Sequence, residues 1–237
     1  MSARRPTQTV WEVRTPGGPA RIHLSPVPLG SPRATLVLGH GAGGGVEAPD
    51  LVAIADALPE IGVEVVRVEQ PWRVRGQKVA GPAITLDSAW TSCLHDLRTR
   101  GIGVRRLVCG GRSAGARVAC RTAQVVTPSA LLLLAFPMHP IRRATLAEPP
   151  NRMPELVAAA RVAPTVVIQG VRDRMGAPDE IAVALAAADV TARVVPIPDG
   201  DHSFRVTARG GTTQAEAIDL IVRAARATAL RILDGRY

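Results

Sequence analysis

The sequence has little cysteine, with only Cys93, Cys109 and Cys120. Their number is odd, each lies inside an apolar segment, and none shows the paired spacing of a zinc site or a disulfide framework. We therefore expect three buried thiols, no disulfide bond and no metal site.

Long uncharged apolar runs are also missing. No segment approaches the roughly 18 consecutive apolar residues that mark a membrane-spanning helix, and the basic start at residues 1–6 is not followed by the apolar region of a signal peptide. These absences predict a soluble, cytoplasmic protein that does not associate with a membrane.

Lysine and aromatic side chains are scarce, although the formal net charge is +9. Lys78 is the only lysine, the arginines are spread from Arg4 to Arg236, and aromatic residues make up 3% of the chain. Nucleic-acid-binding proteins cluster their basic side chains and often stack bases on aromatic rings. We therefore expect no nucleic-acid partner, and we attribute the abundant Arg, Ala, Gly, Pro and Val to a GC-rich coding sequence.

Apolar runs alternate with helical patterns along most of the chain. With 237 residues and 46% hydrophobic content, the chain is large enough for a sizeable core. Such alternation is typical of a largely parallel sheet with helices on both faces. The pattern predicts core strands at residues 34–38, 64–68, 106–109, 130–134, 165–169 and 193–196, and helices at about 50–58 and 86–100, directly after 113, and at 213–233.

The first segment departs from this alternation. Two strand-like runs at residues 9–13 and 20–24 are separated by Thr15-Pro16-Gly17-Gly18, which predicts an antiparallel hairpin. No internal repeat and no low-complexity linker interrupts the chain, so we predict one α/β domain over residues 1–237.

A G-x-S-x-G motif follows the predicted strand that ends at Cys109 and precedes a helical pattern. Strand, motif and helix together indicate a nucleophile elbow, in which a tight turn holds the serine in strained dihedral angles. The positions two before and two after the serine must then be nearly free of side chain, and Gly111 and Gly115 meet this requirement. Ser113 is the predicted nucleophile.

Two more polar residues follow predicted strands. Asp173 comes after the strand at 165–169, and His202 comes after the strand at 193–196. Because the carboxyl ends of parallel strands lie at one edge of the sheet, we expect these side chains to meet Ser113. His202 would take the proton of the serine hydroxyl and later deliver it to the leaving group, while Asp173 would orient the imidazole.

Asp199 and Asp201 are alternatives for the orienting acid because they lie close to His202 in the sequence. Neighbours on one tight loop seldom reach the imidazole from the correct side, so we prefer Asp173.

A glycine-rich loop, Gly39-His40-Gly41-Ala42-Gly43-Gly44, leaves the first core strand. Its backbone amides can approach a bound carbonyl, and we expect the N–H groups of Ala42 and Ala114 to stabilise the oxyanion of acyl transfer. His40 would shape the loop. The alternative is a dinucleotide-binding loop with Glu69 holding a ribose, which the joint presence of elbow, acid and histidine disfavours.

These motifs, with Phe136-Pro137-Met138-His139-Pro140 and Asp201-His202-Ser203-Phe204, resemble those of the α/β-hydrolase superfamily. More narrowly, the chain is similar to the small, lidless branch near the dienelactone hydrolases, which includes bacterial hydrolases and the hydrolase-like domain of testis-expressed and NSL-complex proteins. The resemblance covers about residues 36–204. It implies an α/β-hydrolase fold with a minimal lid, a triad of Ser113, Asp173 and His202, and no metal or organic cofactor.

The chain departs from that group at two places. Ala114 stands where methionine is frequent, and Arg174-Met175 stands where Pro-Phe is more common after the acid. Backbone roles are compatible with both changes, whereas pocket shape and substrate choice depend on them.

Several further residues are candidates for contact with the substrate. Gly41, Trp72 and His139 follow predicted strands, and Trp72 could form an apolar wall, although His139 could equally make a structural hydrogen bond. If Arg112 and Arg172 both pointed into the cleft, they would favour a carboxylate-bearing substrate.

The segment available for a lid is short. Only about 30 residues separate the strands at 130–134 and 165–169, and residues 142–160 have room for little more than one short helix. We therefore expect an accessible pocket and a small-molecule substrate: a short carboxylic ester, a thioester or a lactone. A serine peptidase and a catalytically silent, hydrolase-like interaction scaffold remain alternatives.

Overall fold

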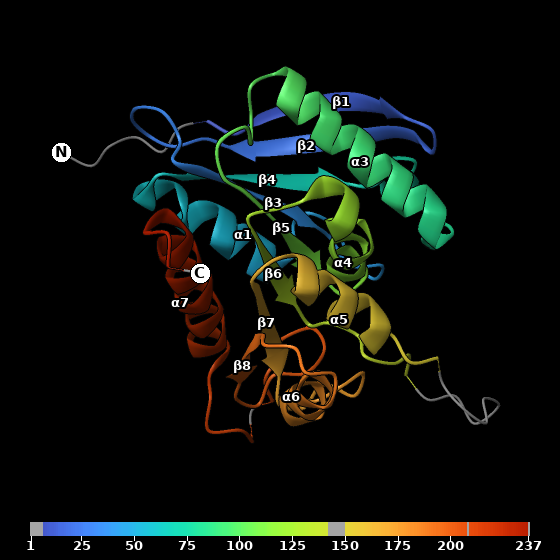
Figure 1. Cartoon of the computed structure of the whole chain (residues 1–237), viewed down its shortest axis with the longest axis vertical. Coiled ribbons are helices and arrows are strands. Elements are labelled where there is room, and N and C mark those ends of the chain that lie inside the picture. The colour runs from blue at the N-terminus through green and yellow to red at the C-terminus, as the bar shows by residue number, and fades with distance from the viewer. Residues whose placement is uncertain (1–6, 142–149, 208, 237) are drawn as a thin grey trace.

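In the part of the chain that the structure describes, the central sheet has eight strands in the order β1-β2-β4-β3-β5-β6-β7-β8 (Figure 1). The computed structural model describes residues 7–141, 150–207 and 209–236. The strands are β1 (Thr9–Thr15), β2 (Gly18–Ser25), β3 (Ala34–Gly39), β4 (Val63–Glu69), β5 (Leu107–Arg112), β6 (Ala130–Leu134), β7 (Thr165–Gly170) and β8 (Arg193–Ile197).

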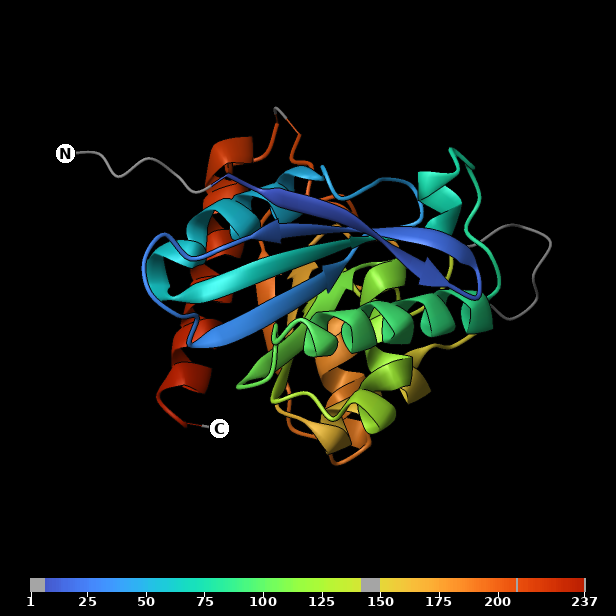
Figure 2. The same cartoon turned by 90° about the horizontal axis from the view of Figure 1, so that it is seen from above.

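The hairpin at one edge is the antiparallel part of this sheet. β1 pairs with β2 in register from Thr9 opposite Leu24 to Thr15 opposite Gly18, and β2 then pairs antiparallel with β4. The neighbours from β4 through β8 are all parallel. The predicted mostly parallel sheet with an antiparallel N-terminal hairpin is therefore confirmed. Figure 2 shows the hairpin along the edge of the twisted sheet.

Helices cover both faces of the sheet, as predicted. They are α1 (Pro49–Ala57), α2 (Pro71–Val74), α3 (Ala83–Thr99), α4 (Ala114–Val126), α5 (Met153–Val162), α6 (Pro178–Ala187) and α7 (Gln214–Leu233), with a 3-10 turn at Pro59–Ile61. Buried side chains of α1 and α7 pack on one face. Those of α3, α4, α5 and α6 pack on the other. Each face therefore has its own apolar core.

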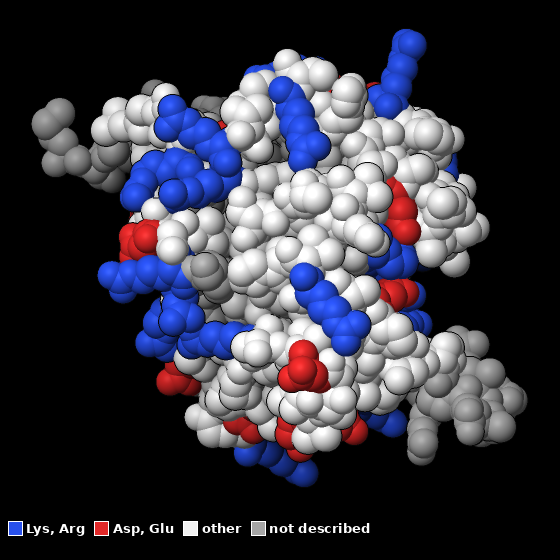
Figure 3. Space-filling model, viewed as in Figure 1, with Lys and Arg blue, Asp and Glu red and all other residues white. Residues whose placement is uncertain are grey.

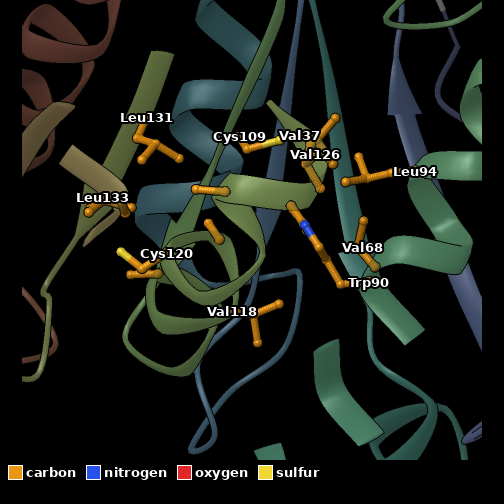
Figure 4. Close-up of a cluster of buried hydrophobic side chains, with 14 of the residues drawn as sticks. Val37, Val68, Trp90, Leu94, Cys109, Val118, Cys120, Val126, Leu131 and Leu133 are labelled. Atoms are coloured by element: carbon orange, nitrogen blue, oxygen red, sulfur yellow. The ribbon is translucent and has the colours of Figure 1, made fainter. Parts of the chain in front are cut away.

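The three cysteines lie in the core on the α3 and α4 side, where Figure 4 shows Cys109 and Cys120 among aliphatic side chains. All three are free and buried. Burial raises the pKa of the Cys93 and Cys109 thiols to about 12. The expectation of three buried thiols is confirmed.

Two predicted boundaries are wrong. The helix expected from residue 86 begins at Ala83, because Pro82 suits a helix start. The sequence pattern missed this first turn because its apolar residue, Ile84, is 75% exposed and does not follow the spacing of the buried positions. The strand expected to end at Cys109 continues to Arg112. Its glycines stay in the sheet because β3 and β6 pair with it on both sides up to Gly39–Gly111 and Arg112–Leu134.

Between β6 and β7 the described residues form only one helix, α5. It agrees with the short helix expected within 142–160, of which residues 142–149 lie outside the described part of the chain. Among the described residues, no helix has both the length and the apolar character to cross a membrane. On the face in Figure 3, basic side chains gather at one margin and acidic side chains lie among them.

Candidate active site

Ser113 lies at the tight junction between β5 and α4, with φ 52° and ψ −107°. Its backbone N–H donates to the carbonyl oxygen of Leu134 over 2.9 Å, which ties the turn to the end of β6. A Cβ atom on Gly111 or on Gly115 would collide with the backbone of Gly39 at the end of β3. Glycine is therefore required two positions before and two positions after Ser113, and the obstacle is the end of β3, which lies outside the G-x-S-x-G motif.

The side chains of Ser113, His202 and Asp173 form one hydrogen-bonded chain. Nδ1 of His202 lies 2.8 Å from Oδ2 of Asp173, and Nε2 lies 2.9 Å from Oγ of Ser113. A neutral imidazole that donates from Nδ1 to the carboxylate leaves Nε2 free to accept the serine proton. The histidine side chain is 24% exposed and the Asp173 side chain is fully buried, so the base faces solvent and the acid does not.

The carboxylate of Asp173 is held by two donors besides His202. Nε2 of Gln169 donates to Oδ2 over 2.8 Å, and the backbone N–H of Met175 donates to Oδ1 over 2.8 Å. Both oxygens thus have hydrogen-bond partners, as the polar atoms of a buried side chain require.

The two alternative acids point elsewhere. Oδ2 of Asp199 accepts from the backbone N–H of Thr212. Oδ1 of Asp201 accepts from the backbone N–H groups of Ser203 and Arg205. Asp173 is the carboxylate that contacts His202.

His40 fixes the start of the glycine-rich loop. Its Nε2 accepts from the backbone N–H of Gln70 over 3.0 Å, and its Nδ1 donates to the carbonyl oxygen of Gly41 over 2.9 Å. Burial lowers the pKa of His40, so the ring is neutral in this arrangement. It stacks at a tilt on Trp72, with ring centroids 5.5 Å apart.

The far end of the same loop is held by Arg67 of β4. Its guanidinium is buried and donates through Nη1 to the carbonyl oxygen of Val46 over 2.7 Å. Both ends of the loop are therefore attached to β4 or to the residue after it.

A buried ion pair joins the elbow to the beginning of α1. Nε of Arg112 lies 3.7 Å from Oδ2 of Asp50, and neither atom has a hydrogen-bond partner in the described part of the chain. Burial raises the pKa of Asp50, while Arg112 and the backbone N–H groups of Asp50 and Leu51 partly oppose that rise. Charge attraction thus links the nucleophile segment to the helix that follows the glycine-rich loop.

A cleft of about 710 Å³ opens beside the hydrogen-bonded chain. Ser113, His202, Gly41 and Ala42 line it. Ala114 is the first residue of α4 and is half-buried, with its backbone N–H in the unpaired first turn of that helix. Ala42 and Ala114, the residues predicted to donate to the oxyanion, therefore lie on the two segments beside Ser113, the glycine-rich loop and the start of α4.

The other two predicted substrate contacts do not line this cleft. Trp72 is 4% exposed and belongs to the apolar core, because the short helix α2 turns it inward against His40. His139 lies with its Nδ1 3.1 Å from the carbonyl oxygen of Pro140, and its backbone N–H donates to Met175.

The charged side chains that line the cleft are balanced in sign: Glu47 and Asp50 against Arg112 and Arg205. Arg172 does not line the cleft and donates to Oγ1 of Thr207. Arg112 and Arg172 therefore do not both point into the cleft, which was the condition for a carboxylate-bearing substrate. Glu69, considered for ribose binding, is instead paired with Arg21 and His23.

Three residues that hold the site were not predicted: Gln169, Arg67 and Asp50. The signal for Gln169 and Arg67 is a long polar side chain next to valine and isoleucine in a predicted strand, where burial requires a specific partner. Among the described residues, no group of three or more His, Cys, Asp or Glu side chains is arranged to hold a metal ion.

Several solved structures have the same fold. A lidless α/β serine hydrolase from Xanthomonas campestris has a TM-score of 0.70 and 23% sequence identity over 95% of each chain. Est1E from Butyrivibrio proteoclasticus has a TM-score of 0.69 and 16% identity over 95% of this chain and 99% of its own. A putative dienelactone hydrolase from Klebsiella pneumoniae has a TM-score of 0.67 and 16% identity over 98% of this chain and 100% of its own.

The sequence itself carries the family assignment. No curated protein matches it closely enough to count as a relative. The family described as the alpha/beta hydrolase domain matches residues 32–229, from just before β3 to within α7. This match includes the glycine-rich loop, the elbow, Asp173 and His202, and the chain therefore belongs to the alpha/beta hydrolase domain family.

Proposed function

We propose that this protein is a serine hydrolase that cleaves small carboxylic esters, thioesters or lactones through an acyl-enzyme on Ser113. The observation that carries the proposal is the unbroken hydrogen-bonded chain from Ser113 through His202 to the buried Asp173, at the wall of an open cleft. We further propose that residues 1–237 form this one domain, since the hairpin before the family match pairs with β4 of the same sheet.

Acylation begins when Nε2 of His202 takes the proton of the Ser113 hydroxyl as the oxygen attacks the substrate carbonyl. The imidazolium that forms lies 2.8 Å from the carboxylate of Asp173, which stabilises its charge and keeps Nε2 directed at the serine. The same Nε2–H then protonates the leaving group, and the acyl group remains on Ser113.

The developing oxyanion needs hydrogen-bond donors. The backbone N–H groups of Ala42 and Ala114 are the proposed pair, each contributing about 3–4 kcal/mol of transition-state stabilisation in sites of this kind. Ala114 adds the favourable electrostatics of a helix N-terminus. Deacylation repeats the sequence with water as the nucleophile and His202 as its base.

The substrate range follows from the lining of the cleft. Only one helix lies between β6 and β7 in the described residues, and the small and polar residues that line most of the cleft leave Met175 and Ile218 as its large apolar side chains. Short acyl groups fit such a site, whereas a long acyl chain would extend past the apolar side chains that the described residues provide.

The test is labelling with a fluorophosphonate probe, combined with a series of p-nitrophenyl esters from acetate to long acyl chains. We expect the wild type to be labelled and to turn over short esters fastest, and Ser113→Ala to lose labelling and at least about 10⁴-fold of turnover with its fold intact. Ser92→Ala on α3 is the control for a serine lost from another half-buried position.

Three outcomes would overturn the proposal in different ways. Activity retained by Ser113→Ala would exclude this serine as nucleophile. A strong preference for long acyl chains would contradict the substrate range. A folded wild type without labelling would favour the interaction scaffold. Cleavage of matched amides would not overturn the proposal but would extend the activity to that of a peptidase.

A further inference from the structure

The side chain of Gln169, the penultimate residue of β7, is fully buried and uses both ends of its amide. Its Oε1 accepts from the backbone N–H of Phe136 over 2.8 Å. Its Nε2 lies 2.8 Å from Oδ2 of Asp173, 2.8 Å from the carbonyl oxygen of Gly176 and 3.2 Å from the carbonyl oxygen of Phe136. Two N–H groups thus serve three acceptors.

The orientation of this amide is determined by its surroundings. A rotation by 180° would set Nε2 against the N–H of Phe136 and set Oε1 against the acceptors that now surround Nε2, so every contact would become repulsive. Phe136 follows β6, so contacts with the neighbouring strand fix the orientation of the Gln169 amide independently of Asp173. The Gln169 amide therefore directs an N–H group, and not its oxygen, at Asp173.

We propose that Gln169 is a positioning residue for Asp173, which it holds in the rotamer that orients His202. This inference rests on the proposed hydrolase function. Oδ2 of Asp173 accepts from Gln169 and from Nδ1 of His202, each over 2.8 Å, while Oδ1 accepts from the N–H of Met175. Without the glutamine, the oxygen that faces the imidazole would be held by the imidazole alone.

A neutral donor suits this position. An amide N–H fixes the carboxylate oxygen while the full negative charge remains available to the imidazolium, whereas a buried cation in the same place would compete for that charge. Gln169 also spans from Phe136 to Gly176, so it joins the end of the neighbouring strand to the loop that carries Asp173.

Two substitutions separate positioning from support of the fold. Gln169→Leu removes every polar contact, and Gln169→Glu keeps the shape but places a second carboxyl beside Asp173. Thr165→Val is the matched control, because Thr165 is buried on the same strand and donates from Oγ1 to Ala163 at the end far from Ser113. All three proteins are compared with the wild type at equal folded fraction.

We expect Gln169→Leu to lower kcat on a short ester roughly 10- to 100-fold with KM within about twofold, the size of effect caused by small misplacements of catalytic groups. In Gln169→Glu the introduced carboxyl is buried next to a carboxylate, which raises its pKa. While protonated, it can donate to Asp173 and should retain more kcat than Gln169→Leu. Once ionised, it repels Asp173, so activity should fall again on the alkaline side, where the wild type keeps its plateau.

A measurement without substrate separates this inference from the proposed function. In proton NMR, the wild type should show a downfield resonance from Nδ1–H of His202, because that proton lies in the short contact to Asp173. Gln169→Leu should shift this resonance upfield or broaden it, and Thr165→Val should leave it in place. A wild type without esterase activity would refute the proposed function and leave this comparison valid.

The inference is overturned if Gln169→Leu melts earlier but keeps the kcat and the His202 resonance of the wild type, because Gln169 would then only support the fold. Should Gln169→Leu fail to fold, Gln169→Glu decides, and a wild-type pH profile in that variant excludes the positioning role.

Discussion

The backbone N–H of Gln70 donates to Nε2 of His40 over 3.0 Å, so a buried imidazole serves as a hydrogen-bond acceptor at the base of the glycine-rich loop. The contact requires a neutral ring, because an imidazolium has a proton on both nitrogens. The loop that carries Ala42 therefore depends on the protonation state of a residue that does not itself contact the cleft.

The first prediction concerns the pH dependence of stability. Burial lowers the pKa of His40 in the folded protein below its ordinary value of 6.5. At a pH between the folded-state pKa and 6.5, the unfolded chain therefore binds a proton at His40 and the folded chain does not. Stability from this site is complete above about pH 6.5 and is lost as the pH falls through the window below it, by at most about 1.4 kcal/mol per pH unit.

The measurement is denaturant unfolding of the wild type and His40→Gln from pH 8 to pH 5. The advantage of the wild type should shrink on acidification, and a constant difference would contradict the prediction. His95→Gln on the exposed side of α3 controls for the substitution itself.

The second prediction concerns the glycines of the elbow. Gly115→Ala places a methyl group on the backbone of Gly39, which cannot move without shifting β3. We expect a loss of at least about 1–3 kcal/mol in unfolding free energy, as for overpacked cores, together with loss of esterase activity. Gly211→Ala meets no atom within 4 Å and is the matched control. Equal melting temperatures for the two variants would show that the elbow has space for a side chain.

The third prediction concerns the ion pairs that attach the elbow helix to its neighbours. Glu155 of α5 accepts two hydrogen bonds from Arg117 over 2.9 and 2.6 Å and one from Arg121 over 3.4 Å, and its side chain is 21% exposed. Glu155→Ala should lower the unfolding free energy by roughly 1 kcal/mol, with a smaller loss at high salt.

The comparison for that variant is Asp219→Ala on α7. Asp219 pairs with Arg223 on the surface, where both side chains are about 60% exposed, and such pairs contribute little to stability. Similar losses in the two variants would mean that the α4–α5 network adds nothing beyond an ordinary surface pair.

The fourth prediction concerns the thiols. Burial raises the pKa of Cys93 and Cys109 to about 12 and raises that of Cys120 as well, so all three are protonated and covered at neutral pH. Iodoacetamide at pH 8 should modify none of them in the folded protein and all three in denaturant. Mass spectrometry counts the modified residues, and a labelled native protein would contradict the burial.

The sequence allowed the parallel core and the hairpin to be predicted because each strand has a local apolar pattern. α6 was not predicted, because its two buried residues, Ile181 and Leu185, lie among alanines and the exposed Val183, so the apolar residues do not mark a single face. The order of the strands was not predicted either, because it depends on which apolar faces meet in space.

The same distinction applies to the site. Ser113, Asp173 and His202 could be selected because each follows a strand, and parallel strands end at one edge. The hydrogen bonds that support the site run between neighbouring segments of the sheet: Gln169 bonds to Phe136 and supports Asp173, and Arg67 bonds to Val46 and supports the glycine-rich loop. Such partners are adjacent only after the strand order is known. Trp72 shows the converse case, because its place after β4 did not reveal that α2 turns it inward.

The contact among Gly39, Gly111 and Gly115 limits how this chain can vary. In most cores, a larger side chain at one position can be accommodated by a smaller one opposite. At Gly111 and Gly115 the atoms within 3 Å of a new Cβ are backbone atoms of residues that already have no side chain. No second substitution can relieve either clash, so a library randomised at Gly111 and Gly115 should return glycine at both, even when the rest of the core is free to change.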